Sequence, residues 1–102
     1  MEKRSAKIVF FAVLHRLMLL FEALSSATRM KIIELLQQTE SMNMDTLAKS
    51  LDITNGALTA HVRKLSECGL VNVKLHTIGH GTQKLCSLGE SKLVIDLLDK
   101  TL

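Results

Sequence analysis

The apolar run at residues 8–24 (IVFFAVLHRLMLLFEAL) most constrains what this chain can fold into. Fourteen of its 17 residues are apolar, so a helix over this run is apolar almost all round. Such a helix must be buried on more than one side. One side can pack on the core of its own chain, and the other then needs a partner, most simply a second copy of the chain. The run therefore predicts a long helix and a homodimer.

Two alternatives account for the same run. A transmembrane helix needs about 20 apolar residues, and here His15 and Arg16 interrupt the run at its middle. A signal peptide would place Lys3, Arg4 and Lys7 ahead of the apolar stretch, but no small-x-small cleavage site follows it. We therefore expect the run to belong to the folded domain, with no membrane partner.

Length and composition exclude several classes of protein. A chain of 102 residues, 47% hydrophobic and 23% charged, has the size and composition of one globular domain. It contains no Trp or Tyr, and its three Phe residues fall within the first 21 positions. RNA-recognition and single-strand-binding sheets need aromatic side chains spread over a platform, so these classes are excluded.

The two cysteines, Cys68 and Cys86, match no disulfide framework and no CxxC zinc spacing. They are expected to be small core residues in a protein of the reducing cytoplasm. His76 and His80 have metal-ligand spacing but lack further ligands nearby. We find no nucleophile with an adjacent base, no paired carboxylates at a cleft and no phosphate-binding loop. We therefore expect no enzyme, no cofactor and no metal site.

Capping residues and apolar spacing predict the remaining elements. Ser26 caps a helix that ends at the polar segment 39–43, and Asn43 caps a short helix over 44–52. A tight turn then leads to a helix beginning at Thr54, with Gly69 at its end. Strands follow on both sides of a turn at residues 76–82, and a last helix is expected from the capping-box spacing of Ser87 and Glu90. The fold class is mainly α with a small β-hairpin (α+β), in the order α-α-α-α-β-β-α.

The positive charge is concentrated in one third of the chain. Residues 54–86 hold four Lys and Arg residues against one Glu, which accounts for the whole net charge of +3. Localised positive charge is the electrostatic signature of a nucleic-acid surface. Two helices joined by a tight turn and followed by a hairpin form the winged helix-turn-helix plan. Its recognition helix presents short polar side chains to base edges in the major groove, and here Asn55, Thr59, Ala60 and Arg63 form that face.

The segment 20–88 resembles the ArsR-type winged-helix transcriptional regulators. The family pattern ALSxPTRLxIL corresponds to residues 23–33, ALSSATRMKII, with Ala27 in place of the proline. The recognition-helix pattern SxxxVSxHLxxLxxxGLV is matched by Thr54, Leu58, Thr59, His61, Val62, Leu65, Gly69, Leu70 and Val71. The resemblance implies a homodimer whose first and last helices form the interface and whose recognition helices enter successive major grooves. It also implies DNA contacts by Thr54, Asn55, Thr59 and His61.

The family's metal sites are not matched. Metal-sensing members carry a cysteine motif on the third helix, where this chain has MDTLAKS at residues 44–50. The other common site pairs Asp with His on the last helix, and Asp96 and Asp99 have no histidine beside them. His61 also has a second interpretation, as a half-buried helix histidine satisfied by the backbone.

We therefore expect a sequence-specific, double-stranded-DNA-binding transcriptional regulator, a homodimeric repressor whose effector no motif identifies. The alternative is a winged-helix docking module for proteins, which predicts a neutral recognition face. Residues 1–25 are assigned to dimerisation, 26–88 to the DNA-binding core and 89–102 to a helix at the dimer interface; an effector domain beyond residue 102 is left open. The expected DNA contacts, from the recognition helix 54–68 and the wing 71–87, are Thr54, Asn55, Thr59, His61, Arg63, Lys64, Lys74, His76, His80 and Lys84. The expected dimer contacts are Phe10, Phe11, Leu14, Leu17, Leu20, Leu97 and Leu98.

Overall fold

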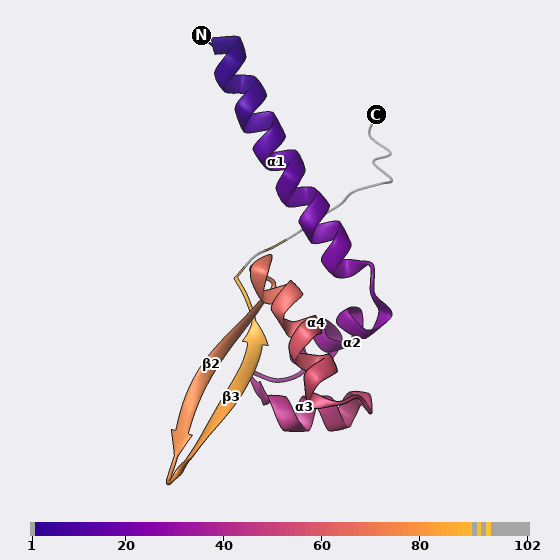
Figure 1. Ribbon diagram of the computed structural model, residues 1–102, viewed down its shortest axis with the longest axis vertical. Helices are drawn as coiled ribbons and strands as arrows, with labels where there is room; N and C mark the ends of the chain where they lie inside the picture. The colour runs from indigo at the N-terminus through magenta and orange to yellow at the C-terminus, as the bar shows by residue number, and fades with distance from the viewer. Residues whose placement is uncertain (1, 91, 93, 95–102) are drawn as a thin grey trace.

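The computed structural model describes residues 2–90 together with 92 and 94, and it has the winged helix-turn-helix plan (Figure 1). Its elements are α1 (Glu2–Leu24), α2 (Ala27–Leu36), β1 (Met42–Asn43), α3 (Met44–Leu51), α4 (Asn55–Glu67), β2 (Val71–Ile78) and β3 (Gly81–Leu88). The strands form an antiparallel sheet in the order β1-β3-β2. The predicted fold class is confirmed.

The helix boundaries follow from capping residues: Ser26 and Asn43 are the predicted caps, and Thr54 caps the helix that was predicted to begin there. The side chains of Ser26, Asn43 and Thr54 each accept a hydrogen bond from the backbone N–H three residues further on, at 2.8–3.3 Å. Each cap supplies an acceptor to a backbone donor that the first turn of a helix leaves unpaired. Gly69 follows the end of α4 with a φ of 75°, the left-handed conformation expected there.

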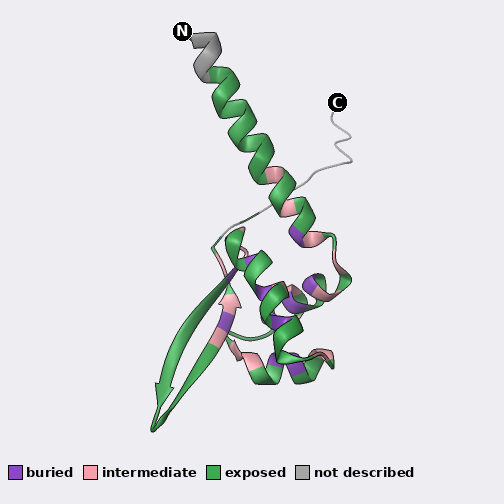
Figure 2. Cartoon of the chain, viewed as in Figure 1, coloured by how far each residue is buried: buried purple, intermediate pink, exposed green. Residues whose placement is uncertain are grey.

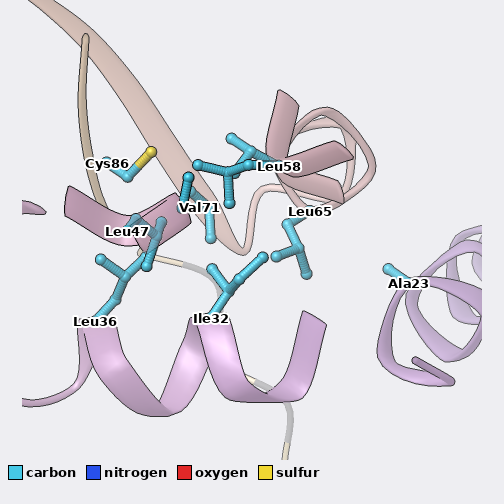
Figure 3. Packing of buried hydrophobic residues seen from close by; sticks show 10 residues of the cluster. Ala23, Ile32, Leu36, Leu47, Leu58, Leu65, Val71 and Cys86 are labelled. Carbon is cyan, nitrogen blue, oxygen red and sulfur yellow. The ribbon is translucent and has the colours of Figure 1, made fainter. Parts of the chain in front are cut away.

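The core lies between α2, α3, α4 and the base of the sheet. Figure 3 shows Ile32 and Leu36 of α2 pointing toward Leu47, Leu65 and Val71, all with relative exposures of 1% or less. The buried apolar residues are Ala23, Ile32, Leu36, Leu47, Ala48, Leu58, Val62, Leu65, Val71 and Cys86. Burying these side chains fixes how α4 is rotated, and therefore which of its residues face solvent.

Helix α1 projects from this core (Figure 1), and Figure 2 shows that most of its length is exposed. Among its described side chains only Ala23 is buried, and Leu17, Leu20 and Leu24 are half-buried. The apolar residues nearer its start have no cover within the described chain. No single described helix is long and apolar enough to span a membrane; α1 and α2 meet that length and composition only as a pair bent by 90°.

The structure corrects two details of the hairpin region. Residues 76–82 were expected to form a turn, but β2 and β3 pair up to Ile78 and Gly81 and leave a two-residue loop. Gly79 has a φ of 58°, and a glycine at the first position of such a loop is typical of a type II′ turn, whose twist suits antiparallel strands. Strand β1 was also missed, because two residues give no alternating pattern.

The predicted capping box at the last helix is wrong. Ser87 lies in β3, opposite Asn72 of β2, so it does not begin a helix. The backbone N–H of Gly89 then donates a hydrogen bond to the backbone oxygen of Leu70 at 2.8 Å. The chain therefore stays paired with the residue that leads into β2. The described residues 89, 90, 92 and 94 are not helical. Most of the predicted last helix, with Leu97 and Leu98, lies outside the described residues.

Candidate nucleic-acid interface

The recognition helix is oriented by its buried stripe. Leu58, Val62 and Leu65 point into the core, and a helix buried along one stripe exposes the residues on its opposite side. Asn55, Thr59 and Arg63 are exposed there, as the sequence predicted. Thr54 is exposed too, with its hydroxyl oxygen committed to the cap of α4.

A shallow groove runs beside this face. It has a volume of about 290 Å³ and is lined by residues from the start of α3, from α4 and from β3: Asn43, Met44, Asp45, Asn55, Thr59, Thr82, Gln83 and Lys84. Two hydrogen bonds order its helical wall. Asn55 Nδ2 donates to Asp45 Oδ1 at 3.1 Å, and Thr59 Oγ1 donates to the backbone oxygen of Asn55 at 2.8 Å. Sequence analysis did not single out Asp45, because its contact is with a residue ten positions further along the chain.

The register of the wing separates its two lysines. Lys84 is two residues from the buried Cys86 along β3, so both side chains are on the face that turns toward the helices. Lys84 accordingly lines the groove. Lys74 pairs with Leu85, and therefore belongs to the opposite face of the hairpin.

The two wing histidines lie on exposed parts of the hairpin. His76 pairs with Gln83 and shares the face of Lys74, while His80 is in the two-residue turn. Among the residues that the structure describes, no three His, Cys, Asp or Glu side chains gather where they can hold a metal ion.

The structure places His61 and Lys64 away from the groove. His61 is half-buried, and its Nδ1 lies 3.1 Å from a terminal nitrogen of Arg29. A guanidinium only donates hydrogen bonds, so Nδ1 accepts and the ring proton is on Nε2. This arrangement supports the structural interpretation of His61, with a side chain rather than the backbone as its partner. Lys64 pairs with Glu22 of α1 at 3.1 Å, and both side chains are largely exposed.

Arg29 is a residue that sequence analysis did not single out. It is 9% exposed, and its guanidinium also donates to the backbone oxygens of Ala23 at 2.6 Å and Glu22 at 3.1 Å. These carbonyls belong to the last turn of α1, which lacks the donors of a continuing helix; Glu22 O also accepts from the N–H and the hydroxyl of Ser25. Arg29 therefore links the end of α1 to α4 through His61.

The other cationic side chains of α4 and the wing form no ion pair within the described residues and can bind an anion. Within the described part of the chain the ion pair of Lys64 and Glu22 is the only one. Arg63, Lys74 and Lys84 are exposed and unpaired there. The positive excess predicted for residues 54–86 is thus presented to solvent on α4 and the wing.

The expected dimer contacts on α1 fall into two groups. Phe10 and Phe11 are each 63% exposed and Leu14 is 41% exposed, while Leu17 and Leu20 are half-buried against their own chain. The latter two line a cavity of about 730 Å³ between α1 and the junction of α4 with β2.

The outward side of α1 carries a heptad pattern that sequence analysis missed. Phe11, Leu14, Met18 and Phe21 recur at alternating intervals of three and four residues, and all are exposed. This is the spacing with which two helices pack along a common seam.

Both cysteines are held as thiols. Burial, followed by the nearby carboxylates of Glu67 and Glu22, raises the pKa of Cys68. Burial alone raises the pKa of Cys86, whose sulfur lies 3.0 Å from Met44 Sδ. A raised pKa lowers the fraction of reactive thiolate at neutral pH, which fits the expected role in the core.

Comparison with known proteins bears on this geometry. Residues 25–72 match the family of winged helix-turn-helix DNA-binding domains. An uncharacterised HTH-type transcriptional regulator of Methanocaldococcus jannaschii is 35% identical over 75 residues, which cover 74% of this chain and 78% of that protein. A further uncharacterised protein of this archaeon is 39% identical over 54 residues, 53% of this chain and 59% of its own length; the chain thus matches less than two thirds of that relative.

A solved structure shares the fold. It is the homodimeric winged helix-turn-helix DNA-binding domain of a possible ArsR-family transcriptional regulator from Mycobacterium bovis, with a TM-score of 0.66 and 22% identity, covering 76% of this chain and 67% of that one. This confirms the resemblance of the fold to ArsR-type regulators. The family and the fold are those of transcriptional regulators and not of enzymes. This chain belongs to the winged helix-turn-helix family of transcriptional regulators.

Proposed function

We propose that this chain is a homodimeric repressor that binds specific double-stranded DNA sequences in the cytoplasm. The observation that carries the proposal is the exposed face of Asn55, Thr59 and Arg63 beside a wing with unpaired lysines. The first three side chains suit base edges in the major groove. The lysines suit the phosphate backbone. A docking module for proteins would need no such concentration of positive charge.

The proposed division of labour follows from position. Arg63 can make a bidentate contact with guanine or bind a phosphate. Lys84 faces the same groove as Thr59 and is proposed to hold the phosphates that flank the bases contacted by α4. Lys74, His76 and His80 are proposed to contact the backbone from the outer face and tip of the wing, whereas His61 and Lys64 support the helix from behind.

The proposed dimer pairs the outward side of α1 with that of a second copy. Large apolar side chains that are half or more exposed, such as Phe10, Phe11 and Phe21, are stabilised by burial in a partner. The homodimeric domain from Mycobacterium bovis with the same fold supports this assembly. We retain 1–25 as the dimerisation segment, 26–88 as the DNA-binding core and 89–102 as a second part of the interface. A dimer bound at a promoter would repress by occupying DNA that the polymerase needs.

Selection of bound duplexes from a random library, followed by affinity measurements, tests the proposal. Thr59→Ala and Arg63→Ala should each cost about 1–3 kcal/mol per half-site on the selected sequence and less on random DNA, because base-edge contacts carry the discrimination. Lys31→Ala, an exposed change on α2, is the control and should leave the ratio of specific to random affinity unchanged. The proposal fails if the wild-type protein selects no sequence, or if both α4 variants keep the wild-type ratio.

A further inference from the structure

We propose that Asp45 is a positioning residue that sets the orientation of the Asn55 amide and so makes Asn55 select adenine. The inference rests on the proposed function, because it concerns how α4 discriminates between bases. Its basis is the 3.1 Å hydrogen bond from Asn55 Nδ2 to Asp45 Oδ1, which joins the first turn of α3 to the first turn of α4.

The hydrogen bond determines which way round the amide lies. An ionised carboxylate only accepts hydrogen bonds, whereas an asparagine amide has two N–H donors at one end and an oxygen acceptor at the other. Only the nitrogen end of Asn55 can therefore face Asp45. Without that neighbour, an exposed asparagine rotates about χ2 and can present either end to a ligand.

The oriented amide keeps the groups needed for adenine. Asp45 takes one of the two N–H donors of Asn55, which leaves one donor and the Oδ1 acceptor for DNA. One donor beside one acceptor matches N7 and the N6 amino group of adenine in the major groove. Thr59 supports this arrangement, because its hydroxyl proton is donated to the Asn55 backbone oxygen at 2.8 Å and does not compete for the adenine N7.

The negative charge of Asp45 weakens DNA binding, so a carboxylate at this position needs a compensating function in a DNA-binding protein. Asp45 is the one acid among the residues that line the groove, and its carboxylate repels phosphate. Repulsion weakens binding to every duplex regardless of sequence. A positioning role gives the carboxylate a compensating effect, which is preference for one base over the others.

Two substitutions separate hydrogen bonding from charge. Asp45→Ala removes both, whereas Asp45→Asn removes the charge but keeps a carbonyl oxygen that can accept from Asn55 Nδ2. An asparagine at position 45 can also donate to Asn55 Oδ1, so it fixes the amide less firmly than aspartate and a small part of the preference is lost. The measurement is affinity for four duplexes that differ only at the base pair whose preference disappears in Asn55→Ala. We expect Asp45→Ala to lower the preference for adenine there by about tenfold, and Asp45→Asn to keep it within about threefold of wild type.

Both variants should bind random duplex more tightly than wild type, and to a similar extent, because each removes the same charge. In the Asn55→Ala background, Asp45→Ala should produce no further loss of preference, since the group that it positions is absent. Glu34→Ala, which removes an exposed acid on α2, is the charge control and should leave base preference unchanged. Circular dichroism of each variant verifies that α3 and α4 remain folded.

Three results would overturn the inference. The first is an Asp45→Ala variant that retains the wild-type preference for adenine, and the second is an Asp45→Asn variant that loses as much preference as Asp45→Ala. A preference for cytosine that disappears in Asp45→Asn would show that the carboxylate accepts directly from a cytosine amino group. Failure of the proposed function has a different signature, because the wild-type protein would then discriminate at no position.

Discussion

Replacing Arg29 with lysine should lower the free energy of unfolding by about 2–4 kcal/mol. Arg29 is 9% exposed, and its guanidinium donates three hydrogen bonds, to two carbonyls of α1 and to His61. Lysine keeps the charge but has a single nitrogen at a different position, so it can retain one of these bonds. Each lost bond from a charged donor costs roughly 1.5–3 kcal/mol, and water reaching the partly exposed end of α1 offsets part of the loss.

Urea denaturation followed by circular dichroism measures this change. Protein concentration must be held fixed, since the stability of a dimer depends on it. Arg63→Lys is the matched control, because it makes the same chemical change on an exposed residue and should cost less than about 0.5 kcal/mol. In thermal denaturation, the expected loss for Arg29→Lys corresponds to a decrease in Tm of roughly 10–25 °C.

The reasoning is refuted if Arg29→Lys and Arg63→Lys unfold at the same urea concentration. A double-mutant cycle then isolates the link to α4. Arg29→Ala and His61→Ala together should be less destabilising than the sum of the two changes by about 1 kcal/mol, because both remove the same 3.1 Å hydrogen bond. Strict additivity would show that this bond contributes nothing to stability.

Three further predictions concern the wing, the dimer and the thiols. Lys84→Ala should reduce the slope of log affinity against log salt by about one for each protomer, and Lys74→Ala by less, because Lys84 faces the groove; equal effects would show that the wing face does not matter. Phe11→Glu should sediment as a monomer at tens of micromolar while the wild-type protein sediments as a dimer. A wild-type monomer at that concentration would refute dimerisation through the exposed face of α1. The raised pKa values of Cys68 and Cys86 predict slower alkylation than free cysteine at pH 7, slowest for the buried Cys86, with rates that increase as the pH approaches those pKa values. Alkylation of Cys68 as fast as free cysteine would contradict this.

The features that sequence predicted correctly depend on neighbours along the chain. A helix cap involves residues three apart, and the stripe of Leu58, Val62 and Leu65 spans two helical turns. Ser26, Asn43 and Thr54 therefore marked helix starts without knowledge of the tertiary structure. The outward position of Thr59 followed from the same stripe, since residues opposite a buried stripe face solvent.

The features that it missed depend on contacts between distant segments. Arg29 and His61 are 32 residues apart in sequence. Strand β1 forms only because Met42 and Asn43 pair with Cys86 and Leu85 of β3, more than 40 residues further along the chain. Family register and charge predict DNA contacts for His61 and Lys64, and these contacts stay predictions. Their partners on α1 and α2 determine where they lie, and nothing local to α4 indicates those partners.

The contacts behind α4 give the proposed dimer a defined geometry. Helix α1 meets α2 at 90°, and two separate contacts hold that corner to the recognition helix: Arg29 between the α1 carbonyls and His61, and the ion pair of Glu22 with Lys64. If two copies pair through α1, any rotation of α1 relative to α4 changes the distance between the two recognition helices. Half-sites on B-DNA are separated by about 34–36 Å for each helical turn, so a small rotation places the second helix out of register with its groove. The buried guanidinium is therefore suited to fix the half-site spacing as well as to stabilise the fold, even though it makes no contact with DNA in the proposed complex.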